Sequence, residues 1–216
     1  MNDNLKPALS ELVGTFTLVF IGAGAGALAQ SSGGGIVAVA FAHGLALMVI
    51  IYALGAVGGG HVNPAVTFSI ALGGKMSWVL AVWYWVAQFV GAVLAAALLK
   101  FALGTQAGSL GATTLANGVS PLQGVVIEAI LTFFLVVAVW TSGVIGKNGN
   151  VVGSAIGWVL TMDILMGGSL TGASMNPART LGPAIISGNF ADIWVYFVGP
   201  LVGGAVAMFV SRYLHS

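Results

Sequence analysis

The sequence predicts an all-α membrane protein with six transmembrane helices and two re-entrant half-helices, arranged as an inverted 3+3 repeat. Three observations predict this fold. Charged residues make up 5% of the chain and hydrophobic residues 58%, whereas soluble domains carry roughly a quarter charged residues. Long apolar stretches recur along the chain, and the two halves share motifs. We expect a single domain over 1–216, with repeat one at about 8–101 and repeat two at about 121–214.

Composition excludes several classes of function. The chain has 216 residues, enough for about six spans of ~20 residues and for no extramembrane domain. A net charge of +1 gives no basis for nucleic-acid binding. Cysteine is absent and the three histidines are scattered, so we expect no disulfide, metal site, catalytic residue or cofactor. The sequence therefore does not indicate an enzyme; the expected environment is a lipid bilayer.

Six apolar stretches fit as membrane spans, at 8–28, 36–57, 78–101, 121–144, 151–168 and 192–214. The segment before the first stretch is too short and too weakly basic for a signal peptide, so we keep that stretch as a span. An even number of spans puts both termini on one side. Lys6, Lys75, Lys147 and Arg212 would share that side and only Lys100 lies near the other, which predicts cytoplasmic termini. We expect the plasma (inner) membrane.

Two further segments, 58–73 and 169–187, are glycine-rich, then briefly apolar, and too short to cross. Each predicts a re-entrant loop that leads into a half-helix. Irregular backbone at membrane depth is tolerated where it lines a water-filled cavity or is covered by protein. Two such segments therefore imply a cavity.

The two halves repeat each other in the same order. Glu11-x-x-x-Thr15-Phe16 matches Glu128-x-x-x-Thr132-Phe133 at an offset of 117 residues, and Asn63-Pro64-Ala65 matches Asn176-Pro177-Ala178 at an offset of 113. Each repeat holds three spans, so the second copy enters the membrane from the opposite side. Such inverted repeats place a site near the bilayer midplane.

The paired Asn-Pro-Ala motifs predict two helix starts that meet inside the membrane. Asn is a favoured N-cap and Pro a favoured first helical residue. Facing N-termini repel cations, protons included, and leave neutral solutes nearly untouched. Asn63 and Asn176 can donate N–H groups to a passing oxygen. The extended runs before the motifs are expected to line the path with backbone carbonyls of Gly59, Gly60, His61, Gly172 and Ser174.

With these motifs, the sequence resembles the aquaporin (major intrinsic protein) family over essentially its whole length. The residues that carry the resemblance are 61–67, His-Val-Asn-Pro-Ala-Val-Thr, and 174–180, Ser-Met-Asn-Pro-Ala-Arg-Thr. The resemblance implies one pore per subunit, usually in a homotetramer. It also implies passive conduction of water and small neutral solutes.

Arg179 follows Asn176 by three residues and lies on the same face of its half-helix, so it too can face the pore. In the resembling family this arginine belongs to a four-residue constriction. The family's spacing assigns the other positions to His43, Ile164 and Ala173. This set is similar to the filter of plant tonoplast-type members. It implies a wider constriction that passes ammonia, urea or hydrogen peroxide beside water.

Three acids remain inside the apolar stretches. Glu11 and Glu128 either carry protons or cations, as in a transporter, or accept hydrogen bonds from the loop backbones. Their symmetric placement favours the structural role, which the family resemblance also implies. The orientation of Asp163 stays open. An ion-coupled secondary transporter is the alternative function, because inverted repeats and broken helices serve both classes.

Overall fold

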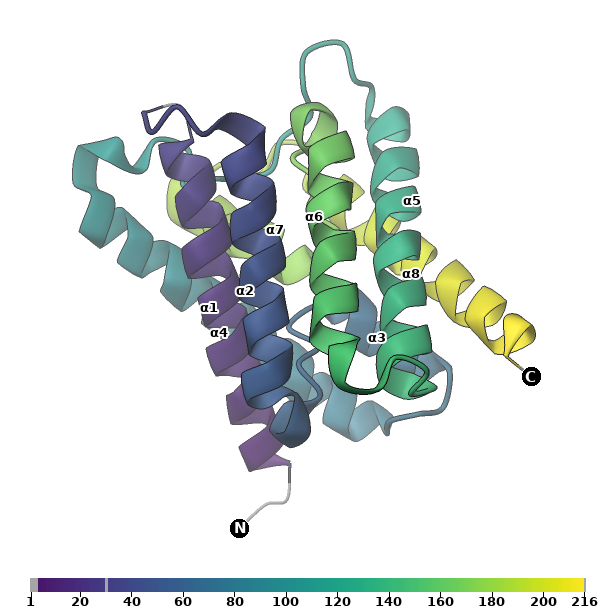
Figure 1. The fold of residues 1–216 in the computed structure, drawn as a ribbon. Coiled ribbons are helices and arrows are strands. Elements are labelled where there is room, and N and C mark those ends of the chain that lie inside the picture. Colours follow the sequence, from purple (N-terminus) through teal and green to yellow (C-terminus); the bar gives the residue numbers. More distant parts are fainter. Residues whose placement is uncertain (1–3, 30, 216) are drawn as a thin grey trace.

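The computed structural model describes residues 4–29 and 31–215. Throughout this part of the chain the structure consists of helices and loops, without strands. Six helices are long and apolar enough to cross a membrane, and Figure 1 shows them packed side by side around two short ones. The long helices are α1 (Leu5–Leu28), α2 (Gly35–Gly58), α4 (Trp78–Leu103), α5 (Pro121–Val139), α6 (Val152–Thr171) and α8 (Val195–Leu214).

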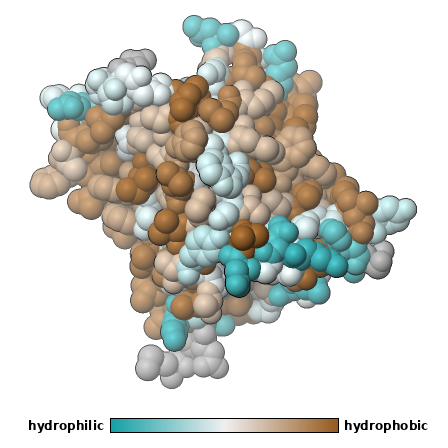
Figure 2. Space-filling model, in the orientation of Figure 1, coloured by the Kyte–Doolittle hydropathy of each residue, from teal (hydrophilic) through white to brown (hydrophobic). Residues whose placement is uncertain are grey.

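The outer surface of the long helices is apolar. Exposed side chains along them include Val79, Val126 and Phe209, which are 66%, 50% and 63% exposed. Figure 2 shows hydrophobic residues over the middle of the molecule and hydrophilic residues gathered toward its upper and lower ends. This distribution matches a protein that is surrounded by lipid, as the composition predicted, and it makes the chain a multi-pass membrane protein.

The expected spans agree with the observed helices to within a few residues. The largest differences are at ends: α6 continues to Thr171 and α8 begins at Val195. The stretch expected as 121–144 is an α-helix only to Val139, and it finishes in a π-helical turn, Trp140–Val144. The hydropathy of a stretch depends on its apolar content and not on its backbone hydrogen-bond pattern. Hydropathy could therefore not predict this turn.

The helices pack through small residues at equivalent places in the two halves. Helix α1 packs on α4, and α5 packs on α8. A Cβ at Gly91 would collide with the backbone of Leu12, and one at Gly203 would collide with the backbone of Ala129. Gly91 and Gly203 therefore allow the same close helix approach, which is how membrane helices associate without a hydrophobic driving force between them.

The two short helices are α3 (Pro64–Leu72) and α7 (Pro177–Ser187). Each packs on the last helix of the opposite half, α3 on α8 and α7 on α4. Gly182 permits one of these contacts, since a Cβ there would collide with the backbone of Ala92. The half-helices thus tie the two halves together at the centre of the bundle.

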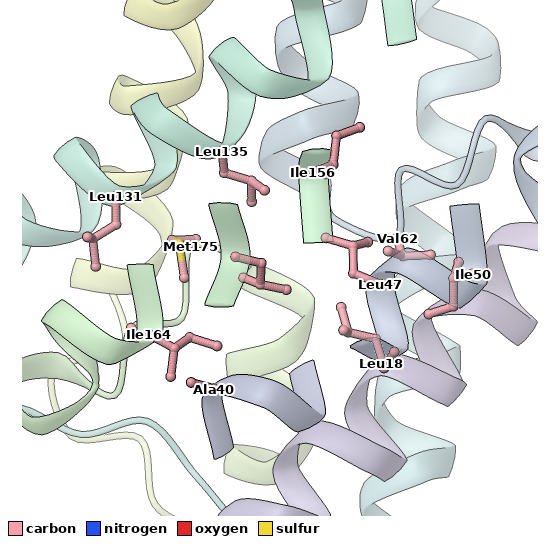
Figure 3. Packing of buried hydrophobic residues seen from close by; sticks show 13 residues of the cluster. Leu18, Ala40, Leu47, Ile50, Val62, Leu131, Leu135, Ile156, Ile164 and Met175 are labelled. Carbon is pink, nitrogen blue, oxygen red and sulfur yellow. The ribbon is translucent and has the colours of Figure 1, made fainter. Parts of the chain in front are cut away.

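The main buried apolar cluster surrounds this centre. Its members come from α1, α2, α5 and α6 and from the two loops before the half-helices. Figure 3 shows Leu18, Leu47 and Val62 gathered on one side of the cluster and Leu131, Ile164 and Met175 on the other. Because both loops contribute a buried side chain, their backbones are fixed relative to the long helices.

Candidate functional site

A cavity of about 850 Å³ extends along the centre of the bundle between the two half-helices. Arg179 and His43 line one part of it, Asn63 and Asn176 line the middle, and Lys75 lies in the lining beyond α3. Much of the remaining wall is aliphatic, with Leu18, Leu47, Leu135, Ile156 and Leu160 among its residues. The cavity therefore combines an apolar wall with a small number of polar groups.

Each asparagine caps its own half-helix. The Oδ1 atom of Asn63 accepts the N–H of Ala65 at 2.8 Å. The Oδ1 atom of Asn176 accepts the N–H groups of Ala178 at 3.0 Å and Arg179 at 3.2 Å. Both asparagines have extended backbone, and a proline follows each, so the predicted helix starts are present.

The same two side chains connect the half-helices to each other. Asn63 Nδ2 donates to the carbonyl of Met175 at 2.8 Å, and Asn176 Nδ2 donates to the carbonyl of Val62 at 2.8 Å. A primary amide carries two N–H groups. Each asparagine uses one in this reciprocal bond, so its second N–H is left for the cavity that both residues line.

The residue before each asparagine has an unusual backbone. Val62 has φ of 45° and Met175 has φ of 53°. Positive φ is rare for residues other than glycine and costly for a β-branched residue. Such a conformation persists when surrounding contacts impose it, and it is common at functional sites.

Glu11 and Glu128 supply those contacts, one for each loop. The carboxylate of Glu11 accepts the N–H groups of His61 at 2.8 Å and Val62 at 2.6 Å. The carboxylate of Glu128 accepts those of Ser174 at 2.9 Å and Met175 at 2.7 Å. These are equivalent positions in the two repeats. Both acids are fully buried, and their bonds hold the loops in the geometry that brings Val62 and Met175 to the opposite asparagines.

Arg179 is held from outside the half-helix. Its side chain is 4% exposed, and Nη1 donates to the carbonyl of Gly111 at 2.6 Å. Its Nε is buried without a partner in the protein. Gly111 lies in the loop between α4 and α5, and a Cβ there would collide with the backbone of Ala23. The glycine thus lets this loop reach down between the helices to the arginine.

Of the other three expected filter residues, His43 lies in the cavity lining with Arg179, whereas Ile164 and Ala173 do not. Ile164 is 1% exposed and Ala173 is 2% exposed, and both belong to the apolar cluster beside the cavity. Gly22 makes room for the His43 ring, because a Cβ there would collide with it. Among the five residues expected to offer carbonyls, Gly59, Gly60, His61 and Ser174 line the cavity and Gly172 does not.

Asp163 is 2% exposed and its Oδ2 atom is buried without a hydrogen-bond partner in the protein. It is not part of the cavity lining. Within the residues that the structure describes, there is no group of three or more His, Cys, Asp or Glu residues that could hold a metal ion.

The sequence did not identify four residues that the structure places beside the loops. Gln88 donates to Glu11 Oε2 at 2.8 Å and to Thr67 Oγ1 at 3.0 Å. In the second repeat the Thr180 hydroxyl lies 2.8 Å from that of Thr113. For Gln88, the available signal was that it is a polar residue in an apolar span. Thr67 and Thr180 recur at the same place in the two motifs, but nothing in the sequence showed which groups they contact.

Comparisons with known proteins place this arrangement among the membrane channels. The sequence model described as Major intrinsic protein matches residues 1–211. A protein named "Probable aquaporin TIP2-2" from Oryza sativa subsp. japonica is 43% identical over 98% of this chain and 88% of its own length. "Aquaporin TIP1-2" from Zea mays is 43% identical over 96% of this chain and 85% of its own. The solved structure of the aquaglyceroporin from Plasmodium falciparum superposes with a TM-score of 0.87 at 25% identity, over 98% of this chain and 97% of that one.

Proposed function

This chain belongs to the major intrinsic protein family, and from that premise we propose that its central cavity conducts water together with small neutral solutes and excludes protons and other ions. It is a passive transmembrane channel and not an enzyme, in keeping with its aquaporin relatives. The observation that carries the proposal is the reciprocal pair of bonds from Asn63 to Met175 and from Asn176 to Val62.

This pair fixes two N–H donors at the place where two helix N-termini meet. A water molecule that accepts from Asn63 and Asn176 directs its own hydrogens outward. Water on either side is then oriented away from the centre, which interrupts the donor-to-acceptor sequence that proton transfer requires. The positive ends of α3 and α7 add an electrostatic barrier to any cation.

Arg179 and His43 are proposed as the polar part of a selectivity filter, with Ile164 and Ala173 shaping its apolar part. In support, Arg179 and His43 share the cavity lining, and Ile164 and Ala173 lie buried next to it. With an aliphatic side chain and a methyl group at these positions, the constriction is wider and offers a solute fewer hydrogen bonds than it would with two polar side chains. We therefore propose ammonia, urea and hydrogen peroxide as further permeants.

We further propose that the chain assembles as a homotetramer with cytoplasmic termini. A homotetramer is supported by family resemblance. Cytoplasmic termini are supported by the Lys and Arg distribution and by Figure 1, where the start of α1 and the end of α8 lie toward the same, lower part of the molecule. The expected plasma membrane gains no support from the relatives, which are plant proteins of the TIP type.

Reconstitution into liposomes tests the function. Stopped-flow light scattering should show faster osmotic shrinkage than in empty liposomes, with a low activation energy. In the same vesicles, imposed proton and sodium gradients should decay no faster than in the protein-free control. A proton or sodium flux that scales with the amount of protein would overturn the proposal and favour the ion-coupled alternative.

A further inference from the structure

The two histidines in the cavity lining, His43 and His61, are held by different hydrogen bonds. The Nδ1 atom of His43 lies 2.9 Å from the carbonyl oxygen of Val39. A carbonyl only accepts, so Nδ1 of His43 carries the proton. In the neutral ring Nε2 is then an acceptor, and it is buried without a partner in the protein. The lone pair of His43 is thus left unpaired, on the ring edge that lies against Gly22.

The hydrogen bonds around His61 run in the opposite sense and begin at Gln88. The Gln88 amide nitrogen is 2.8 Å from Glu11 Oε2 and 3.0 Å from Thr67 Oγ1. Both Glu11 oxygens already accept backbone N–H groups, which orients the Gln88 amide with its nitrogen toward them. An amide nitrogen only donates. The Thr67 oxygen therefore acts as an acceptor in this contact.

Thr67 still has its own hydroxyl hydrogen to donate. The Nδ1 atom of His61 lies 3.1 Å from Thr67 Oγ1. Among the described residues this hydroxyl has only Gln88 and His61 as partners, so Nδ1 of His61 is the acceptor for this hydrogen. The proton of the neutral His61 ring is then on Nε2. The ring is fixed edge-on to Tyr84, with centroids 5.2 Å apart. Nε2 lies beside Gly59, where a Cβ would come within 2.9 Å of it, and both His61 and Gly59 line the cavity.

We propose that Gln88 and Thr67 hold His61 as the Nε2–H tautomer, the reverse of His43, and that His61 is thereby a second specificity-determining residue that offers cations no imidazole lone pair at the inner end of the pore. Gln88 and Thr67 are positioning residues in this scheme. The inner end is the one near the start of α1, since a Cβ at Gly58 would meet the Pro7 carbonyl at 2.9 Å. The inference rests on the channel function proposed above.

The tautomer of each histidine fits the charge near it, with Arg179 close to His43 at the outer end and no fixed cation among the described residues paired with His61 in this scheme. A cation that enters a pore must replace its water ligands with lone pairs of the wall. At the outer end the acceptor of His43 lies in the same lining as the fixed charge of Arg179, which repels cations. At the inner end, His61 contributes an N–H that can donate to water but cannot coordinate a sodium or ammonium ion.

Histidine-selective ¹⁵N labelling gives a direct test, because the chain has three histidines. Solid-state NMR of the channel in bilayers reports which ring nitrogen carries the proton. His215→Asn removes the signal of the third histidine and simplifies assignment. The expected result is protonation of Nδ1 in His43 and of Nε2 in His61. Protonation of His61 at Nδ1 in the unmodified channel would overturn the proposal.

Thr67→Val and Thr67→Ser separate the effect of the hydroxyl group from the effect of the side-chain volume. Thr67→Val removes the donor to Nδ1 while it keeps the side-chain shape, so a large share of His61 should shift to the Nδ1–H tautomer. Thr67→Ser retains the hydroxyl and should retain the original tautomer. Thr180→Val, the equivalent change in the second repeat, is a matched control that should leave the His61 signal unchanged.

Cation flux in liposomes tests the role in specificity. Thr67→Val should raise sodium or ammonium leak several-fold over wild type, with Thr67→Ser at the wild-type level and water permeability similar in all three. A shifted tautomer with no increase in cation leak would overturn the role of His61 and leave the channel function intact. Failure of the channel function itself would instead appear as absent water permeability in the wild type.

Discussion

Arg179 donates a hydrogen bond from Nη1 to the backbone carbonyl of Gly111 at 2.6 Å, although 68 residues separate them in the chain. The bond joins the second half-helix to the loop between α4 and α5. It leaves the guanidinium Nε buried and unpaired in the protein within a cavity lining that also includes His43. The charge is therefore fixed in position at the wall of the cavity.

Replacement of this arginine should weaken selectivity without loss of the fold. Arg179→Val removes the charge that repels cations. Each ~1.4 kcal/mol removed from the electrostatic barrier raises the rate tenfold, so cation flux should rise on the order of tenfold or more. Isotope uptake into liposomes measures this change. Arg212→Val, at the exposed end of α8, is the matched control and should have the wild-type profile. An unchanged profile in Arg179→Val would mean that the arginine does not act on the pore.

The buried acids should matter for stability rather than for transport of protons. Glu128 accepts hydrogen bonds from Thr171, Ser174 and Met175. Glu128→Ala leaves three buried donors unpaired, each at a cost of ~1–3 kcal/mol, so the thermal unfolding midpoint in detergent should fall clearly. Glu128→Gln keeps one acceptor oxygen, so it should lower the thermal unfolding midpoint less than Glu128→Ala does.

The same variants distinguish the channel from the ion-coupled transporter. In a transporter, Glu128→Gln would abolish coupled flux, because the amide cannot exchange a proton. In the channel, the folded fraction of Glu128→Gln should conduct water at the wild-type rate per molecule. Wild-type stability of Glu128→Ala would contradict the structural role assigned to this residue.

The absence of cysteine predicts insensitivity to mercury and offers a way to locate Ala173. Wild-type water permeability should not change when mercuric chloride is added, since the chain has no thiol. Ala173→Cys should make it sensitive if this position borders the constriction, with recovery after a reductant. Val90→Cys on the exposed face of α4, where Val90 is 43% exposed, is the control and should stay insensitive. Mercury block of the wild type, or none in Ala173→Cys, would contradict this assignment.

Much of the architecture could be predicted because its causes are local. Lipid requires long apolar helices, and Asn-Pro-Ala begins a helix wherever it follows irregular backbone. The half-helices α3 and α7 consequently begin where the sequence indicated, at Pro64 and Pro177. The match between Glu11 and Glu128 indicated an internal repeat, and the three spans in each half indicated that the second copy is inverted.

The partners of these residues depend on packing between distant segments and could not be predicted. Gln88 reaches Glu11 and Thr67 only because α4 crosses α1 beside the first loop. Gly111 reaches Arg179 from a loop whose sequence shows no regular pattern. The positions of Ile164 and Ala173 came from family spacing, which identifies a residue in α6 or in the loop after it without fixing which side of that segment borders the cavity.

The width of the filter is the property that decides which solutes pass beside water. Ile164 offers no hydrogen bond, so a solute at this level exchanges its bonds to water for those of Arg179, His43 and the loop backbone. Each bond that is not replaced costs ~1–3 kcal/mol. Ammonia needs few replacements and is close to water in size, urea needs more, and glycerol is the widest. We expect uptake into wild-type liposomes to follow this order.

Ile164→His should change that order by adding a ring and a polar group at the constriction. Urea uptake relative to water should fall on the order of tenfold, which is the effect of ~1.4 kcal/mol, while ammonia should fall less. Ile156→His is the matched control, because Ile156 lies on the same helix, is similarly buried at 4% exposed, and lines the cavity two turns away. It should leave the solute ranking as in the wild type. If the wild type passes water alone, or if Ile164→His keeps the wild-type ranking, Ile164 does not set the width and the channel is specific for water.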